Sequence, residues 1–332
     1  MTNLAEPAGV ATGARDKRDY RSDQQIRWCP GCGDYAILAQ FHKMLAAVGA
    51  NKEDHVIVSG IGCASRFPYY VDTYGLHGVH GRAPAIATGI KAVNPSLTVW
   101  VVTGDGDALS IGVGHLIHAL RRNVDIKILL LNNAVYGLTK GQASPTSFPG
   151  QVTPSSPAGV VDRSLNPLRL ALTAGATFVA RCVDSHGRQM RDVLIAAAEH
   201  RGAALVEIWQ NCPVFNDGAF VQPSRNYLHL RPGQPLTVGG DGERALTLDQ
   251  GGRLRVQRTD DADPPLLRHD VGNAALAGLL ADIEGDDLPV PVGIYYRCTR
   301  PVHSDALRPE PPLQGRRSAQ ELLDAGRIPR AG

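Results

Sequence analysis

Two short polar motifs carry the residue types that hold a diphosphate and a magnesium ion. Gly104-Asp105-Gly106 follows an apolar, β-branched run, and Asn132-Asn133 ends the next such run after 25 intervening residues. Mg²⁺ prefers oxygen ligands, which Asp105 offers as a carboxylate, Asn133 as an amide and Val135 as a backbone carbonyl. The glycines let backbone N–H groups approach phosphate oxygens. We therefore predict a diphosphate and Mg²⁺ site here, the alternative being an ordinary pair of turns.

The cysteines indicate a second site. Six cysteines are too few for a disulfide scaffold in 332 residues, and the close pair Cys29 and Cys32 indicates metal or redox chemistry. A thioredoxin-like redox pair usually follows a strand, and no strand-like run precedes Trp28. Zinc and an iron–sulfur cluster both fit this spacing, and either needs further ligands from Cys63, Cys182, Cys212 and Cys298. Cys63 and Cys212 follow predicted strands, whereas the other two suit buried small apolar side chains.

The elements that must position these motifs alternate between strands and helices. Apolar or β-branched runs predict strands at residues 56–58, 97–102, 126–131, 177–180 and 204–209. Helical spacing of apolar residues predicts helices at 34–49, with Gly49 as the cap, at 84–93, at 106–122, and between 180 and 204. This alternation predicts an α/β fold with a doubly wound parallel sheet, whose ligands bind outside the carboxyl ends of the strands.

The chain divides into three regions. Residues 1–25 are polar and charged, and we expect a mobile N-terminal arm. Residues 26–230 hold the motifs and form the binding domain, and their Gly/Ser/Pro/Thr-rich segment 134–164 is long enough to be an active-site loop. Residues 231–332 are rich in Gly, Pro, Asp and Arg, which predicts a partly irregular C-terminal appendage with one helix near 273–283. Its Gly240-Asp241-Gly242 triplet follows no strand-like run and is interpreted as a surface turn.

Composition excludes some classes of partner. Apolar residues make up 43% of the chain, enough for a sizeable core, and the net charge is only +2 with both signs scattered. A groove for nucleic acid or a polybasic membrane patch is therefore not expected. No apolar run approaches the roughly 20 residues of a membrane span, and the N-terminus is not signal-like. We expect a cytoplasmic protein with no nucleic-acid or membrane partner.

Taken together, the motifs resemble the β subunits of 2-oxoacid:ferredoxin oxidoreductases of the 2-oxoglutarate type, and the spacing from Gly104 to Asn133 resembles the thiamine-diphosphate signature. The matching segments lie between residue 26 and about residue 230. They are Trp28-Cys29-Pro30-Gly31-Cys32-Gly33, Gly60-Ile61-Gly62-Cys63-Ala64-Ser65-Arg66, His77-Gly78-Val79-His80-Gly81-Arg82-Ala83, Gly104-Asp105-Gly106-Asp107, and Asn132-Asn133-Ala134-Val135-Tyr136-Gly137-Leu138-Thr139-Lys140-Gly141-Gln142.

The resemblance implies an activity and its cofactors. The enzymes of this family decarboxylate a 2-oxoacid, pass its electrons through a [4Fe-4S] cluster to ferredoxin and transfer the acyl group to coenzyme A, or run the reverse carboxylation. By resemblance the cluster ligands are Cys29, Cys32, Cys63 and Cys212. The implied thiamine diphosphate contacts are Ile61, Gly62, Cys63, Ala64, His80, Gly81, Gly106, Asp107, Gly137 and Leu138. The role of His80 rests on the motif alone.

The resemblance also implies a partner subunit. Thiamine enzymes generally use a glutamate against the aminopyrimidine ring, and that residue comes from a separate pyrimidine-binding domain. No second doubly wound unit of that kind is evident in the 332 residues. A larger α subunit is therefore expected to supply the glutamate, together with most contacts to coenzyme A and substrate. The expected assembly is a heterodimer or a dimer of heterodimers.

Lys140 suggests which 2-oxoacid is used. It directly follows the implied cofactor contacts Gly137 and Leu138, so that its ammonium group could reach the far end of a bound substrate. Pyruvate ends there in a methyl group, whereas 2-oxoglutarate ends in a carboxylate that is costly to bury without a cation. We predict 2-oxoglutarate, with pyruvate or a broad range of 2-oxoacids as the alternative. A non-redox thiamine decarboxylase or acetohydroxyacid synthase and a zinc-stabilised binding module are less favoured.

Overall fold

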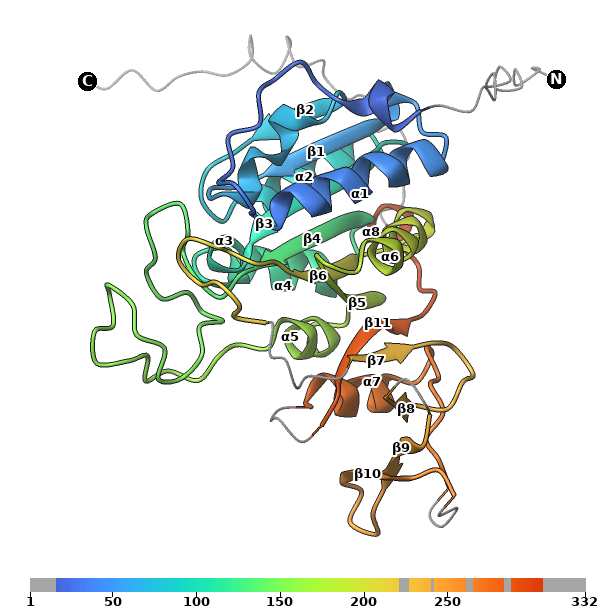
Figure 1. The fold of residues 1–332 in the computed structure, drawn as a ribbon. Helices are drawn as coiled ribbons and strands as arrows, with labels where there is room; N and C mark the ends of the chain where they lie inside the picture. The colour runs from blue at the N-terminus through green and yellow to red at the C-terminus, as the bar shows by residue number, and fades with distance from the viewer. Residues whose placement is uncertain (1–15, 221–226, 240–241, 261–264, 284–287, 307–332) are drawn as a thin grey trace, which may run out of the picture.

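An eight-stranded sheet forms the centre of the computed structural model, which describes residues 16–220, 227–239, 242–260, 265–283 and 288–306 (Figure 1). In spatial order its strands are β2 (Tyr74–His77), β1 (His55–Ser59), β3 (Thr98–Gly104), β4 (Ile126–Asn132), β6 (Ala204–Trp209), β5 (Phe178–Val183), β11 (Val290–Arg297) and β7 (Tyr227–Leu230). All neighbouring pairs run parallel except β11 with β5. The predicted α/β fold with a mostly parallel sheet is confirmed.

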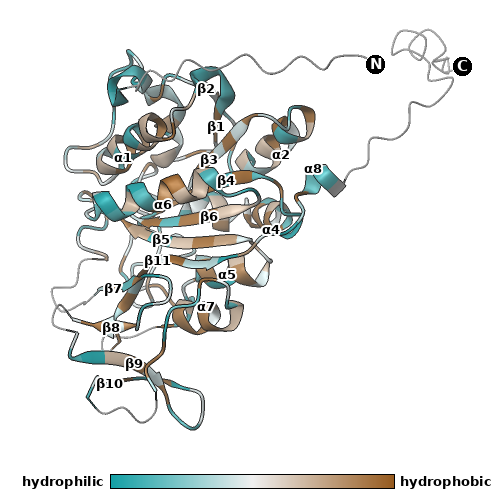
Figure 2. Cartoon of the chain, turned by 90° about the vertical axis from the view of Figure 1, so that its right-hand side faces the viewer, coloured by the Kyte–Doolittle hydropathy of each residue, from teal (hydrophilic) through white to brown (hydrophobic). Residues whose placement is uncertain are grey.

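Helices cover both faces of this sheet. The α1 helix (Asp34–Ala47), the α6 helix (Gly187–Glu199) and the 3-10 helix η3 (Ala64–Tyr70) share one apolar core with one face. On the other face pack α2 (Ala83–Val93), α4 (Val113–Arg121), α5 (Pro167–Thr173) and α7 (Ala274–Ala281). Successive residues of β4 point into alternate cores, Leu130 into one and Leu129 into the other. Because both faces are covered, the central strands are mostly apolar (Figure 2).

The predicted helices occur, with one interruption. The α1 helix buries Ile37, Phe41 and Leu45, and Gly49 follows its end with a φ of +64°. The helix expected to reach residue 122 is instead divided into α3 (Asp105–Leu109) and α4. A Cβ atom on Gly112, in the break, would lie 2.5 Å from the carbonyl oxygen of Asp107. The break lets the chain pass this close to the site, which a continuous helix would not allow.

Part of the segment expected to be an N-terminal arm packs against the domain. Residues 1–15 lie outside the described residues, but the short helix η1 (Lys17–Tyr20) already packs against α1. Tyr20 is fully buried and donates a hydrogen bond to the carbonyl oxygen of Ala50 at 2.6 Å. The charged neighbours of Tyr20 remain exposed, but the Tyr20 carbonyl also accepts a hydrogen bond from the N–H of Asp72 at 2.9 Å, so the segment is held although its composition suggests mobility.

The C-terminal region is divided between the main sheet and an appendage. The β11 strand lies between β5 and β7, so the sheet extends past the expected boundary at residue 230. The expected hairpins form a separate three-stranded sheet of β8 (Thr237–Val238), β9 (Arg244–Leu248) and β10 (Leu254–Arg258), and α7 matches the expected helix. Two short helices, η2 (Lys52–Asp54) and α8 (His303–Ala306), complete the elements described. Gly240 and Asp241 lie outside the described residues. No described helix has the length and apolar character needed to cross a membrane.

Candidate functional site

Loops that leave the carboxyl ends of β1, β3 and β4 surround a cavity of about 550 Å³. All three predicted Mg²⁺ ligands line it: Asp105, Asn133 and Val135. Of the predicted cofactor contacts, it is lined by Ile61, Gly62, Cys63, Ala64, His80, Gly106, Asp107, Gly137 and Leu138. Gly81 and Lys140 are not among the lining residues. The structure thus brings together predicted residues that lie more than 70 positions apart in the sequence, from Ile61 to Leu138.

The buried carboxylate of Asp107, which follows β3, links the loops that follow β1 and β2. Its Oδ1 accepts hydrogen bonds from the backbone N–H groups of Ile61 at 3.1 Å and Gly81 at 2.7 Å, and lies 2.6 Å from Nδ1 of His80. Its Oδ2 accepts from the Thr103 hydroxyl at 2.7 Å. Because an ionised carboxylate only accepts hydrogen bonds, Nδ1 of His80 carries the proton in this pair. Asp107 thereby fixes the orientation of the imidazole at the edge of the cavity.

The Asp105 carboxylate is suited to a bound cation. It is 3% exposed, and burial raises the pKa of this carboxyl above its usual range. Its Oδ2 accepts a hydrogen bond of 2.7 Å from the hydroxyl of Thr146, and no basic side chain among the described residues forms an ion pair with it. A buried carboxylate without a cationic partner is costly, and a divalent cation would offset that cost. Asn133 and Val135 bring oxygen atoms to the same cavity.

Two glycines of this cavity lie next to side chains of the site. A Cβ atom on Gly106 would lie 2.2 Å from the ring of Tyr136, whose hydroxyl donates a hydrogen bond to the Gly106 carbonyl at 3.0 Å. A Cβ atom on Gly137 would lie 3.7 Å from both the Cys63 and the Cys212 sulfur atoms. The loop that carries the predicted cofactor contacts is therefore packed against two of the predicted cluster ligands.

Lys140 lies at the tip of the same loop. Backbone hydrogen bonds between Tyr136 and Gln142 close the loop, and Lys140 has a φ of +78°. Its side chain is exposed and does not line the cavity formed by this chain alone. Contact between Lys140 and a substrate therefore remains a prediction.

The four predicted cluster cysteines differ in exposure but share one neighbourhood. The Cys32 sulfur accepts a hydrogen bond from the Gln210 amide at 3.2 Å, Cys212 is buried, and Cys29 is exposed. Burial, followed by the nearby Asp34 carboxylate, raises the pKa of Cys63 to about 11 and moves the pKa of Cys32 in the same direction. Cys212 contributes to both pKa shifts, Cys29 to that of Cys63 and Cys63 to that of Cys32, which reflects their proximity. Metal binding to such thiols must release protons.

The remaining two cysteines lie elsewhere. Cys182 belongs to β5 and is fully buried in the apolar core, as expected. Cys298 is only half-buried, and its backbone N–H donates to the carbonyl of Thr177 at the amino end of β5. Neither residue lines the cavity or is among the neighbours of Cys32 and Cys63.

Several residues of the site were not singled out in the sequence. Tyr136, Thr139, Gln142, Ala143 and Ser155 line the cavity together with Gln210. All but Gln210 belong to the segment 134–164, which therefore lines the cavity where an active-site loop was predicted, although composition could not select individual residues. Thr146, which contacts Asp105, carries no sequence signal apart from its place in that segment.

Comparisons with known proteins agree with this geometry. Residues 60–208 match the family described as thiamine pyrophosphate enzyme, C-terminal TPP binding domain. The chain is 50% identical to the 2-oxoglutarate oxidoreductase subunit KorB of Mycobacterium tuberculosis, over 92% of this chain and 85% of that protein. It is 45% identical to a 2-oxoacid:ferredoxin oxidoreductase subunit beta of Aeropyrum pernix, over 61% of this chain and 66% of that one.

A solved structure gives the same result for the fold. The structure of 2-oxoglutarate:ferredoxin oxidoreductase from Magnetococcus marinus, determined with 2-oxoglutarate, coenzyme A and succinyl-CoA bound, superimposes with a TM-score of 0.73 at 34% identity. The match covers 88% of each chain. With half of its residues identical to a relative along nearly its whole length, the chain belongs to the family of 2-oxoacid:ferredoxin oxidoreductase β subunits.

Proposed function

We propose that this β subunit takes part in the oxidative decarboxylation of 2-oxoglutarate to succinyl-CoA and CO₂, with ferredoxin as the electron acceptor, or in the reverse carboxylation. The observation that carries the proposal is the single cavity that joins the Asp105 turn, the loop of Cys63 and the loop of Gly137. The names of the Mycobacterium tuberculosis relative and the Magnetococcus marinus structure favour 2-oxoglutarate. A broader 2-oxoacid range, as in the name of the Aeropyrum pernix relative, is the alternative.

In this proposal the cavity binds thiamine diphosphate and Mg²⁺. Asp105, Asn133 and the Val135 carbonyl hold the ion, which offsets the buried charge of Asp105. Asp107 holds His80 and the N–H groups of Ile61 and Gly81 around the cofactor. When bound, the cofactor stabilises the carbanion that remains after CO₂ leaves a 2-oxoacid. The protein residues contribute by holding the diphosphate and by excluding water.

In this proposal Cys29, Cys32, Cys63 and Cys212 hold a [4Fe-4S] cluster. Among the described residues, no three His, Cys, Asp or Glu side chains are close enough together to hold a single metal ion. A four-iron cluster keeps its thiolate ligands further apart than one ion does. Cysteines that are neighbours, but not close enough together to hold one ion, therefore fit a cluster better than zinc. The Gly137 loop, next to Cys63 and Cys212, brings the cluster site beside the cofactor cavity, as electron transfer requires.

We further propose that the chain works in the cytoplasm with an α subunit, as a heterodimer or a dimer of heterodimers. The α subunit supplies the glutamate for the aminopyrimidine ring and most of the coenzyme A site. The proposal is supported by the subunit names of the relatives and by the exposed apolar side chains of Ile61 and Leu138 at the cavity, which are 39% and 43% exposed. A partner that covered these side chains would also enclose the cofactor.

The isolated chain is expected to be inactive. Even with thiamine diphosphate, Mg²⁺ and a reconstituted cluster, it should show no 2-oxoglutarate-dependent reduction of ferredoxin or viologen. The reason is that, in this proposal, the α subunit supplies the glutamate for the aminopyrimidine ring. Addition of the α subunit and coenzyme A should restore turnover. Turnover by the isolated β chain at a rate comparable to that of the complete enzyme would contradict the proposed division of labour.

Lys140→Ala is expected to lower kcat/KM for 2-oxoglutarate by about 10- to 100-fold, which corresponds to the loss of one charged hydrogen bond of roughly 1.5–3 kcal/mol. The value for pyruvate, which has no second carboxylate, should change little. The measurement uses both substrates with the complete two-subunit enzyme, and Lys17→Ala, at an exposed site that does not line the cavity, is the control. An equal fall for both substrates would remove Lys140 from substrate selection.

A further inference from the structure

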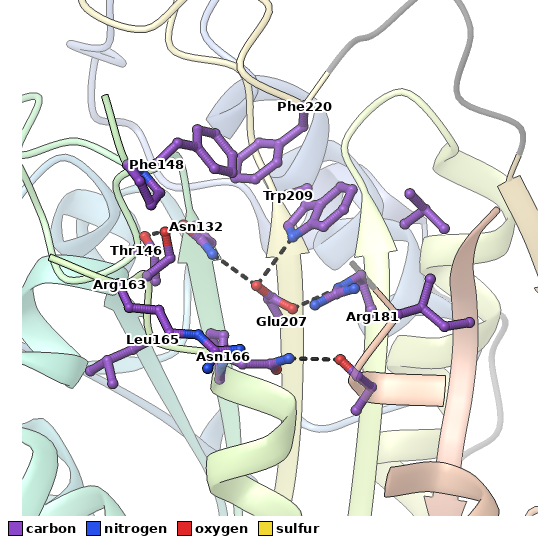
Figure 3. A pocket seen from close by; sticks show the side chains of 16 residues that line it. Asn132, Thr146, Phe148, Arg163, Leu165, Asn166, Arg181, Glu207, Trp209 and Phe220 are labelled. Carbon is purple, nitrogen blue, oxygen red and sulfur yellow. Dashed lines mark hydrogen bonds and ion pairs between the residues drawn. The ribbon is translucent and has the colours of Figure 1, made fainter. Parts of the chain in front are cut away.

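We propose that Thr146 and Asn132 are positioning residues for the Asp105 carboxylate and that the buried Arg181–Glu207 ion pair anchors them. The inference rests on the proposed role of Asp105 as the Mg²⁺ ligand. It assigns a role to Asn132, the first asparagine of the Asn132-Asn133 pair, which does not line the cofactor cavity. The side chains of these four residues line a second cavity of about 290 Å³ (Figure 3), whereas Asp105 lines the cofactor cavity.

The chain of contacts begins at Asp105. The Thr146 hydroxyl lies 2.7 Å from Oδ2 of Asp105 and 2.9 Å from Oδ1 of Asn132. The hydroxyl has one proton, which it shares between the two oxygens in a three-centre hydrogen bond whose shorter contact goes to the carboxylate. The Asn132 oxygen also accepts a hydrogen bond from the backbone N–H of Ala134 at 3.1 Å, which holds it in place. Thr146 therefore restricts the rotation of the carboxylate that faces the ion.

Asn132 connects this contact to a second carboxylate. Its Nδ2 donates to Oε1 of Glu207 at 2.8 Å, and the Trp209 indole donates to the same oxygen at 3.1 Å. Figure 3 shows these side chains converging on Glu207 from β4 and β6. Thr146, Asn132 and Glu207 are 4%, 3% and 1% exposed, so water does not compete for their hydrogen bonds.

Arg181 fixes the far end of the network. Its Nε donates to Oε2 of Glu207 at 2.7 Å, and its guanidinium carbon lies 4.5 Å from the centre of the Trp209 ring. Burial lowers the pKa of Arg181, but the charges and hydrogen bonds of Glu207 and Tyr295 together outweigh this effect, so that the pKa is raised overall and the guanidinium stays charged. A buried ion pair contributes little stability compared with apolar residues of similar volume, and its better-attested role is to fix the orientation of its neighbours. In this network the ion pair fixes the orientation of Asn132, Thr146 and Asp105.

The test is the affinity for a divalent ion of the complete two-subunit enzyme saturated with thiamine diphosphate. Mn²⁺, titrated by electron paramagnetic resonance, replaces Mg²⁺ as the probe. Thr146→Val keeps the shape of the side chain and removes the hydroxyl, and it should weaken Mn²⁺ binding by about 10- to 100-fold, as the loss of a group that orients a metal ligand does. Thr146→Ser, which keeps the hydroxyl, should restore binding to near the wild-type value.

Matched variants separate positioning from folding. Thr177→Val removes another fully buried hydroxyl, bonded to Asn123 at 2.8 Å at the opposite edge of the sheet, and should lower the melting temperature without weakening Mn²⁺ binding. If Thr146→Val fails to fold, Asn132→Ala tests the same chain of contacts. Wild-type affinity in the Thr146 or Asn132 variant that folds, with binding lost in Asp105→Ala, would overturn the network and leave the proposed ion site intact. Wild-type affinity in Asp105→Ala as well would overturn both.

Discussion

Replacing Cys63 or Cys212 by alanine is expected to remove the brown colour of the anaerobically purified enzyme, together with about four irons per chain. These two sulfur atoms lie against the same face of Gly137, beside the cofactor cavity. The loss of either would leave three thiolates for four iron corners, and the site would be open to solvent. The same result is expected for Cys29→Ala and Cys32→Ala. Iron analysis and visible absorbance of the two-subunit enzyme provide the measurement.

Cys182→Ala and Cys298→Ala are the matched controls, since they remove the same atom outside the site. Cys182 lies in the apolar core, so its loss should lower stability but leave the iron content unchanged. Cys298→Ala should alter neither the colour nor the iron content. A complete cluster in the Cys212→Ala enzyme, or zinc in place of iron in the wild type, would show that the ligand set is wrong.

The central sheet could be predicted because buried parallel strands differ clearly from their surroundings. β1, β3, β4 and β6 are buried on both faces and appear in the sequence as mostly apolar runs, with Lys127 and Glu207 as buried exceptions. The motifs at their carboxyl ends then had to meet at one edge, since ligands of doubly wound sheets bind there. Asp105, Asn133 and Cys63 accordingly line one cavity.

The edge of the sheet could not be predicted in the same way. The β11 strand pairs antiparallel with β5, although more than 100 residues separate the two in the chain, and it lies in a region rich in loop-forming residues. No local pattern distinguishes such a strand from one of a separate hairpin. Tyr20 presents the same difficulty, because its buried ring and its backbone contact with Asp72 hold a segment whose neighbouring side chains are charged and exposed.

Within the site, motif residues could be predicted and the groups that support them could not. Asp105 and Asp107 belong to a recognisable turn, but their partners depend on the tertiary fold. Thr146 lies 41 residues from Asp105, and Glu207 lies 75 residues from Asn132. Threonine, glutamate and arginine are common on protein surfaces, so only their burial next to the site distinguishes these residues. The sequence therefore predicts where the cofactor binds better than it predicts what holds the site rigid.

Asp105→Ala is expected to abolish tight binding of thiamine diphosphate in the presence of Mg²⁺. The diphosphate carries several negative charges into a cavity in which Asp105 is the carboxylate placed to retain the neutralising ion. Without it, Asn133 and the Val135 carbonyl offer only neutral oxygens, which hold a hard divalent ion weakly. Calorimetric titration of the two-subunit enzyme with the cofactor, at fixed Mg²⁺, should give no measurable heat of binding. Asp105→Asn should behave similarly, since it keeps the volume and removes the charge.

Asp241→Ala is the control within the same chain, because Gly240-Asp241-Gly242 repeats the triplet but follows β8, a strand of the three-stranded sheet and not of the central sheet. This variant should bind the cofactor as the wild type does. The melting temperature of Asp105→Ala without cofactor provides a second check: removal of a buried, unpaired carboxylate should leave it unchanged or raise it, because burial already disfavours the charge. Loss of cofactor binding without loss of stability therefore identifies Asp105 as a binding residue. Equal losses of binding in the Asp105 and Asp241 variants would contradict the assignment of the site to the first triplet.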